Sequence, residues 1–206
     1  MRLEPIAAGH AAPLAEAAAE NRASYGFTWV PDGLDDALSY VDRALEYQAT
    51  GRALPFAVRR LADERVIGCT RFLDLQVFTW PPPWPPGVGL GPEPADDQPP
   101  SVAEIGATWY AASAQRTGVN AECKLLMLTQ AFDVWRVHRV TFKTDARNRA
   151  SRGAIERLGA MPDGVLRAHS PASDGTIRDT AYYSVLAAEW SEVSAGLRRR
   201  LTRLAA

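Results

Sequence analysis

The sequence predicts a mixed α+β fold made of about seven strands and about five helices. Segments with alternating or β-branched residues are separated by longer segments in which apolar residues recur at helical spacing. Two strand segments, 54–60 and 66–75, are joined by Ala62-Asp63-Glu64-Arg65, which is typical of an antiparallel hairpin. Neither an internal repeat nor a convincing boundary interrupts the chain, so we expect one domain over residues 1–206.

The composition is that of a globular protein, with 47% hydrophobic and 23% charged residues. A formal net charge of −1 argues against a nucleic-acid or membrane partner. The N-terminus lacks a signal core, and no apolar run approaches the ~18 residues of a membrane span, so we expect a soluble cytoplasmic protein. Cys69 and Cys123 lack metal-ligand spacing and are expected to be buried thiols, and no metal site is expected.

The first part of the chain is predicted to hold a strand, two helices and the hairpin. A short strand at 2–6 precedes an alanine-rich helix at 10–22. Residues 23–31 are aromatic and turn-like, and a second helix follows at 34–50 and ends at Gly51. The apolar stripe of this helix consists of Ala37, Tyr40, Val41, Ala44 and Leu45.

A proline-rich insertion is predicted at 79–101. Its first 22 residues, 79–100, contain nine of the fifteen prolines and show no periodicity. Proline cannot donate to a sheet ladder, so the segment is an insertion rather than a strand. A structureless loop of this length is functional or disordered. A plain surface loop, a lid and a dimer contact all remain open for it.

The turn at 115–122 leads from a strand at 102–111 into a long helix that is expected to end near Arg136. Ala121, Leu125, Leu128 and Phe132 recur on one face of that helix. The first turn of a helix leaves backbone N–H groups unpaired and favours negative charge, so this helix start is a candidate phosphate site. An ordinary loop-to-helix junction is the alternative.

The last third of the chain is predicted to alternate strands and helices. Strands are expected at 139–144, 165–169 and 176–186, and helices at 151–158 and 190–205. Gly159 is positioned to stop the shorter helix.

Three motifs in this order resemble one family. Glu104-Ile105-Gly106-Ala107-Thr108-Trp109 resembles the strand before its pyrophosphate loop, and Gln115-Arg116-Thr117-Gly118-Val119-Asn120 matches its Gln/Arg-x-x-Gly-x-Gly/Ala, with Asn120 in place of the last small residue. Asn148 to Gly159 matches Asn-x-x-Ser followed by Leu-Gly. The chain thus resembles the GCN5-related N-acetyltransferase (GNAT) superfamily, and best its RimJ/RimL-type branch of ribosomal-protein alanine acetyltransferases.

The resemblance implies a central, mostly antiparallel twisted sheet of about seven strands, flanked by helices, with a cofactor cleft where two strands splay apart. It also implies acetyl-CoA as donor, with its pantetheine arm along the strand that ends near Tyr110. The residues implied to bind it are Trp109, Tyr110, Arg116, Thr117, Gly118, Val119, Asn120, Ala121 and Asn148. Asn120 is bulkier than the usual glycine, so it is expected to crowd the loop amides, to cap the helix or to bond a phosphate oxygen.

The implied reaction is direct attack of a neutral amine on the thioester. An α-amine, with a pKa of about 7.8, needs only a modest base, whereas a lysine needs a stronger one. A backbone N–H near Trp109–Tyr110 is expected to hold the resulting oxyanion. Ile155 occupies the position of the superfamily's usual tyrosine acid. The RimJ/RimL-type branch uses the serine of Asn-x-x-Ser instead, which implies Ser151, with helix capping as the alternative role.

Two residues are candidates for the base. Glu104 lies where superfamily members often place a carboxylate, and a surface strand residue is the alternative. His169 lies near a glutamate of the RimJ/RimL-type branch and has a suitable ordinary pKa; an exposed strand-end histidine is its alternative. Tyr25, Phe27 and Trp29 are expected either to wall the acceptor site or to form a plain aromatic cluster.

We therefore predict an acetyl-CoA-dependent N-acetyltransferase whose acceptor is a primary amine, either a protein N-terminus or a small molecule. A non-catalytic acyl-CoA-binding module is the alternative, and Asn120 and Ile155 keep it open. A third interpretation is an interaction domain that presents the proline-rich segment as a polyproline ligand. Monomer and homodimer both remain open.

Overall fold

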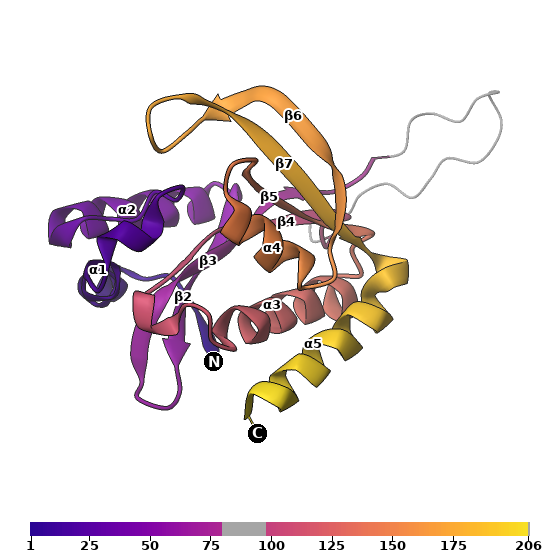
Figure 1. The fold of residues 1–206 in the computed structure, drawn as a ribbon, viewed down its shortest axis with the longest axis horizontal. Helices are drawn as coiled ribbons and strands as arrows, with labels where there is room; N and C mark the ends of the chain where they lie inside the picture. The colour runs from indigo at the N-terminus through magenta and orange to yellow at the C-terminus, as the bar shows by residue number, and fades with distance from the viewer. Residues whose placement is uncertain (80–97, 206) are drawn as a thin grey trace.

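Seven strands form a single sheet in the order β1-β2-β3-β4-β5-β7-β6 in the computed structural model, which describes residues 1–79 and 98–205 (Figure 1). The strands are β1 Arg2–Pro5, β2 Ala53–Arg60, β3 Arg65–Gln76, β4 Val102–Tyr110, β5 Arg139–Asp145, β6 Met161–Pro171 and β7 Ile177–Leu186. Neighbouring strands pair antiparallel, except that β4 and β5 run parallel. The predicted mixed α+β fold with a mostly antiparallel sheet is confirmed.

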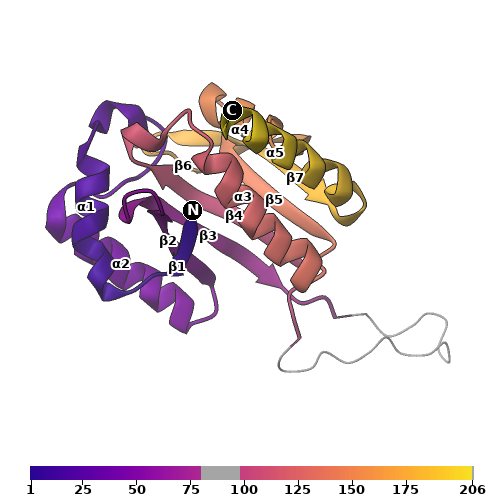
Figure 2. The ribbon, with the colours of Figure 1, turned by 90° about the horizontal axis from the view of Figure 1, so that it is seen from below.

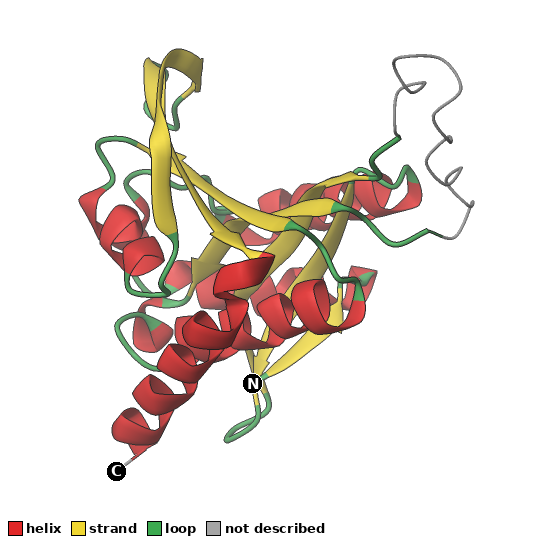
Figure 3. Ribbon diagram, turned by 90° about the vertical axis from the view of Figure 1, so that its right-hand side faces the viewer, coloured by secondary structure: helices red, strands yellow, loops and turns green. Residues whose placement is uncertain are grey.

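The helices are α1 Ala11–Ala19, α2 Gly33–Ala49, α3 Val119–Thr129, α4 Arg149–Glu156 and α5 Trp190–Ala205. Figure 2 shows α1 and α2 together on one side of the sheet and α3 and α5 on the other. The central helical segment ends at Val134, close to the predicted end near Arg136, but its last part, Gln130–Val134, is π-helical. The strand predicted at 165–169 is longer, and with β7 it forms a hairpin that projects beyond the helices (Figures 1 and 3).

The helices pack by the apolar stripes that the sequence predicts. In α2 the stripe residues Ala37, Tyr40, Val41 and Ala44 are buried, and in α3 Ala121 and Leu128 are at most 2% exposed. Burying a leucine side chain contributes about 1.5–3 kcal/mol, so these contacts hold each helix against the sheet. No helix in the described parts of the chain is both long and apolar enough to span a bilayer.

The two faces of the sheet carry different side chains. On the side that we call the α2 face, Arg71 of β3 lies opposite Gly106 of β4, and Leu73 lies opposite Glu104. The Arg71 guanidinium reaches Tyr40 of α2 with a hydrogen bond of 2.7 Å, which fixes this orientation. The opposite side, the α3 face, is packed by α3, α4 and α5.

Strands β4 and β5 part after a short paired stretch. Their register partners are Val102 and Arg139, Ala103 and Val140, and Glu104 and Thr141, although both strands continue beyond these pairs. A β-bulge in β4 accompanies the split, because Ala107 and Thr108 together face the single residue Thr70 of β3. Ala107 has a φ of 46°, as expected where a bulge bends a strand.

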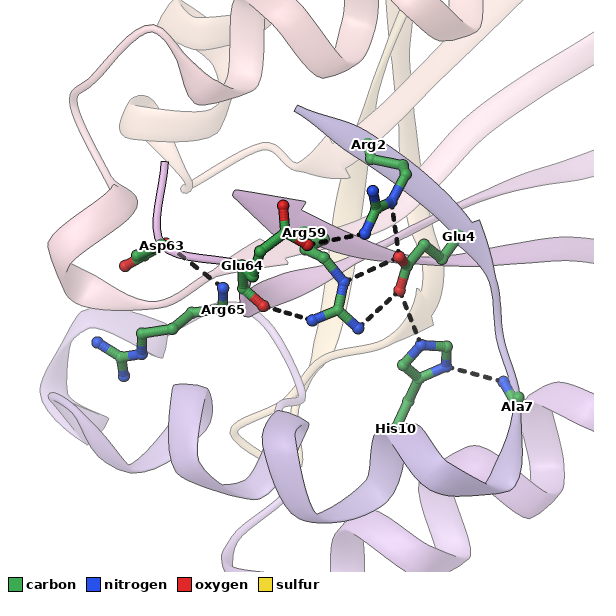
Figure 4. Close-up of polar contacts among 8 residues, drawn as sticks. All are labelled: Arg2, Glu4, Ala7, His10, Arg59, Asp63, Glu64 and Arg65. Atoms are coloured by element: carbon green, nitrogen blue, oxygen red, sulfur yellow. Dashed lines mark hydrogen bonds and ion pairs between the residues drawn. The ribbon is translucent and has the colours of Figure 1, made fainter. Parts of the chain in front are cut away.

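A polar network fastens the edge strand β1 to the body (Figure 4). The Glu4 carboxylate accepts hydrogen bonds of 2.8 Å from both Nε and Nη2 of Arg59 on β2, and one of its oxygens lies 3.2 Å from His10 Nε2. The Arg59 hydrogen bonds lower the pKa of Glu4 to about 2, so the carboxylate stays ionised in all but strong acid. The network fixes the first strand next to the start of α1.

Most of the proline-rich insertion predicted at 79–101 lies outside the described residues, and so do its proposed roles as surface loop, lid or dimer contact.

Candidate active site

A cleft of about 920 Å³ opens where β4 and β5 part. Side chains from both sheet faces line it. Lys124, Phe142 and Ser151 belong to the α3 face, and Tyr40, Arg71 and Lys143 belong to the α2 face. A compound entering from one side can therefore meet a compound entering from the other.

The loop before α3 provides unpaired backbone donors at the edge of this cleft. Thr117 organises the loop: its hydroxyl donates to Ala114 O at 2.6 Å and accepts from Val119 N at 3.2 Å. Within residues 1–79 and 98–205, no acceptor is found for the backbone N–H groups of Arg116, Thr117, Gly118, Asn120 and Ala121. Unpaired amides at a helix start fit a diphosphate, so this loop suits the donor that the sequence predicts.

Asn120 does not cap the helix. Gly118 is the N-cap residue and α3 begins at Val119, so Asn120 is the second helical residue and the capping alternative is wrong. Its Oδ1 instead accepts a hydrogen bond of 3.3 Å from the Tyr110 hydroxyl at the end of β4. The Asn120 side chain is thus hydrogen-bonded to β4, and the backbone N–H of Asn120 has no acceptor in the described structure.

Asn148 and Ser151 divide two roles at the start of α4. Asn148 is the N-cap, and its Oδ1 accepts from Ser151 N at 3.0 Å. Capping is therefore done by Asn148, and the capping alternative for Ser151 is wrong. Ser151 lines the cleft, and its hydroxyl makes no hydrogen bond with any described residue. It is available to a ligand, as a proton donor in the cleft needs to be.

Ile155 fills the position where the superfamily's tyrosine acid would stand. It is 8% exposed and packs in the apolar cluster of the α3 face while also lining the cleft. This position thus has no titratable group, which leaves Ser151 as the nearest hydroxyl of the predicted motif.

Glu104 lies at the base of the split and is 7% exposed. Its Oε2 is 2.6 Å from Lys143 Nζ, and the same ammonium is 2.7 Å from Asp74 Oδ2. Burial raises the pKa of Glu104 to about 7, even though the Lys143 ammonium opposes that rise. A carboxyl group with a pKa near neutrality, lining the cleft, has the properties of a general base.

His169 is not brought to the cleft. It lies on β6 with its Nδ1 3.1 Å from the Thr180 hydroxyl and its Nε2 3.3 Å from the Tyr182 hydroxyl. The cleft lining does not include it, whereas Glu104 is included. The two candidate bases therefore lie at different places.

The predicted aromatic wall is only partly present. Phe27 and Trp29 line the cleft. Tyr25 instead donates its hydroxyl hydrogen to Tyr110 O at 3.1 Å and packs edge-on against Trp109. Trp109 is 3% exposed and its side chain does not line the cleft.

The loop residues Gly118, Val119 and Ala121 are likewise absent from the side chains that line the cleft, whereas Arg116, Thr117 and Asn120 are present. The backbone N–H groups of Gly118 and Ala121 have no acceptor among the described residues, so a ligand can bind them. The Val119 N–H cannot bind a ligand, because it donates to the Thr117 hydroxyl.

Two buried cations in the cleft were not anticipated from the sequence. Lys124 is 4% exposed and donates to Thr108 Oγ1 at 2.7 Å and Thr70 Oγ1 at 3.0 Å. Burial lowers its pKa to about 8, and no carboxylate among the described residues pairs with it. Arg71 is 7% exposed. A signal for both was present in the sequence, because Arg71 and Lys124 are basic residues within largely apolar segments.

Comparison with known proteins agrees with this geometry. The profile of a family described as "Acetyltransferase (GNAT) domain" matches residues 1–161. A GCN5-related N-acetyltransferase from Brucella melitensis is 26% identical, with a TM-score of 0.76 over 96% of this chain and 80% of that chain. A putative acetyltransferase from T. thermophilus is 29% identical, with a TM-score of 0.71 over 97% of this chain and 93% of that chain.

A more distant similarity shows the fold alone. Mycobacterium smegmatis RimJ, solved in complex with CoA-disulfide, is 18% identical, with a TM-score of 0.74 over 96% of this chain and 88% of that chain. No curated protein sequence matches this chain. Because the family profile covers most of the chain and the sheet splits between β4 and β5, the chain belongs to the GNAT family of acetyltransferases.

Proposed function

We propose that the protein transfers an acetyl group from acetyl-CoA to a primary amine, either a protein N-terminal α-amine or an amine of a small molecule. The observation that carries this proposal is the cleft at the β4–β5 split, which has unpaired loop amides at one side and Glu104 at its base. In the reaction, a nitrogen–carbon bond forms, the carbon–sulfur bond breaks, the amine loses a proton and the thiolate gains one.

The donor is assigned to the α3 face. When bound, acetyl-CoA supplies the thioester that is broken. The free amides of the loop from Arg116 to Ala121 hold its diphosphate, and the helix dipole of α3 adds roughly 0.3–1 kcal/mol per charge. The side-chain NH2 of Asn148, whose Oδ1 is used in capping, would donate to a carbonyl oxygen of the pantetheine arm.

Glu104 is assigned as the base that takes the proton of the amine, directly or through water. Its pKa of about 7 leaves a good part of the population ionised at neutral pH while keeping it basic enough to accept a proton. Lys143 holds the carboxylate in place at 2.6 Å. Because His169 lies outside the cleft lining, we assign it no role in the chemistry.

Ser151 is assigned as the group that donates a hydrogen bond to the departing thiolate. Ser151 lines the cleft, and its hydroxyl has no competing partner in the described residues. Asn148 and Ser151, followed by Leu158 and Gly159, keep the pattern of the RimJ/RimL-type branch. On that ground we propose that Ser151 acts as the serine of this branch does.

The proposal is tested by measuring acetyl-CoA binding and turnover separately. Thermal unfolding with and without acetyl-CoA reports binding, and release of free thiol with a panel of amines reports turnover. We expect Ser151→Ala to keep binding and to lose roughly tenfold to a hundredfold in kcat. Ser194→Ala, in α5 and away from the cleft, is the matched control. Binding without thiol release for any amine would identify a sensor module instead of an enzyme.

A further inference from the structure

Arg71 carries a buried positive charge that no described residue neutralises. It is 7% exposed, and no carboxylate within residues 1–79 and 98–205 lies at ion-pair distance from it. Its Nη2 donates to the Tyr40 hydroxyl at 2.7 Å, but its buried Nε has no partner. An unpaired charge and an unpaired buried donor are each costly, so their retention here needs a reason.

The surroundings of Arg71 form a cationic, aromatic wall of the cleft. Trp29 stacks on Tyr40 with ring centroids 5.6 Å apart, and the Arg43 guanidinium lies 5.1 Å above the Trp29 ring. Arg71 itself lies 5.3 Å from the Tyr40 ring centroid. All four residues line the cleft, and Arg43 also lacks a carboxylate partner in the described part of the chain.

This wall lies on the same sheet face as Glu104. Arg71 is opposite Gly106 in the sheet, and Glu104 is two residues along β4 from Gly106. Strand geometry therefore separates the Cα atoms of Arg71 and Glu104 by roughly 8 Å. If the nitrogen of an acceptor amine lies at Glu104, a substituent a few bonds from that nitrogen can reach Arg71.

We infer that the amine acceptor carries an oxyanion, a carboxylate or a phosphate, which the guanidinium of Arg71 binds with help from Arg43. This inference rests on the proposed acetyl transfer and specifies its acceptor. A guanidinium binds carboxylate and phosphate through paired N–H donors, and these bonds are stronger in a site from which water is excluded. The binding group is Nη1 of Arg71, because Nη2 donates to Tyr40, Nε is fully buried, and Nη1 makes no hydrogen bond with any described residue.

The kinetic test compares amines with and without an anionic group, with kcat/KM expressed per unprotonated amine because the anionic group also raises the pKa of the amine. Phenylalanine is compared with phenylalaninamide, and phosphoethanolamine with ethanolamine, so the two pairs separate carboxylate from phosphate. We expect kcat/KM for the anionic member of at least one pair to exceed that of its neutral partner by roughly tenfold to a hundredfold. Equal values within both pairs would overturn the inference while leaving the acetyltransferase intact.

Three variants locate the preference. Arg71→Gln should abolish the preference for the anionic amine, mainly through KM, and Arg71→Lys should keep part of this preference. Arg43 is exposed, so Arg43→Gln should weaken the preference without a risk to folding. Arg52→Gln is the matched control, because Arg52 stacks on Tyr47 at 4.7 Å but does not line the cleft. An anionic preference that persists in both Arg71→Gln and Arg43→Gln would refute the assignment.

A binding measurement keeps the inference testable apart from turnover. With the loop amides saturated by CoA, titration with inorganic phosphate and with benzoate is followed by calorimetry. We expect one of these anions to bind the wild type and Arg52→Gln, and not Arg71→Gln. Absence of binding to the wild type would count against the site. If thiol is released from no amine while this binding is present, the proposed function fails and the anion site stands.

Discussion

Lys143 and Glu104 form an ion pair of 2.6 Å at the point where β4 and β5 part. Glu104 belongs to the paired stretch through Thr141, and Lys143 lies two residues further along β5. The same ammonium reaches Asp74 on β3 at 2.7 Å. One cation thus connects three strands beside the cleft and opposes the rise that burial causes in the pKa of the proposed base.

The first prediction concerns Glu104→Gln. If Glu104 is the base, kcat/KM of the wild type rises with pH through about 7, because the carboxyl group must lose its proton to accept one from the amine. The variant should lose roughly 10²–10⁴-fold in kcat/KM together with this inflection. The measurement is a pH–rate profile with saturating acetyl-CoA.

Asp74→Asn provides the control for that profile. The negative charge of Asp74 helps to raise the pKa of Glu104, so its removal should move the inflection to lower pH without abolishing activity. An inflection near pH 7 that survives in Glu104→Gln would exclude Glu104 as its source.

The second prediction separates two functions of Asn148. Asn148→Ala removes the N-cap of α4 and should lower the free energy of unfolding by about 1 kcal/mol. Asn148→Asp keeps an oxygen for capping but loses the side-chain NH2. Both variants should bind acetyl-CoA more weakly, and only Asn148→Ala should lose stability, as measured by urea unfolding and by calorimetry. Wild-type affinity in Asn148→Asp would limit Asn148 to capping.

The third prediction concerns the buried ammonium of Lys124. Its folded-state pKa, about 8, lies below the ordinary value of 10.5, so between these pH values the unfolded chain binds the extra proton. Stability therefore rises with pH in this window, and Lys124 contributes up to ~3 kcal/mol to the rise.

Lys124→Met cannot make this contribution. The unfolding free energy of the wild type should therefore rise relative to that of the variant as pH increases from about 8 to about 10.5. Urea unfolding at several pH values measures this difference. A difference that stays constant over this window would contradict a lowered pKa of Lys124 in the folded protein.

The fourth prediction tests the close packing of β3 against β4. Gly68 has a φ of 154°, and a Cβ atom there would lie 2.2 Å from the Trp109 carbonyl oxygen. Because backbone cannot yield as a flexible side chain does, Gly68→Ala should cost at least about 2–3 kcal/mol of stability. Gly9→Ala, where a Cβ would meet no atom within 4 Å, is the control and should be close to neutral.

Local periodicity was sufficient to predict much of the fold. The apolar stripe of α3 predicts burial of Ala121 and Leu128, and both are buried because helical spacing alone decides which residues share a face. The change from α-helical to π-helical geometry at Gln130–Val134 was not predicted, since a π-helical turn has no periodic signature.

The site was harder to predict, because its key contacts join distant residues. The burial of Lys124 depends on Thr70, 54 residues earlier in the chain, and that of Arg71 on Tyr40, 31 residues earlier. The position of His169 depends on the register of β6, which shifts between Leu166 and Ser170. Neither distant contacts nor a register shift can be inferred from the residues next to these side chains.

The early parting of β4 and β5 has a mechanical consequence. The sheet consists of a half from β1 to β4 and a half from β5 to β6, held along a seam of three residue pairs. So short a seam leaves few hydrogen bonds between the halves, and a donor bound in the opening would contact both of them. We expect the two halves of the ligand-free sheet to move relative to each other along this seam. Binding of acetyl-CoA should restrict that motion.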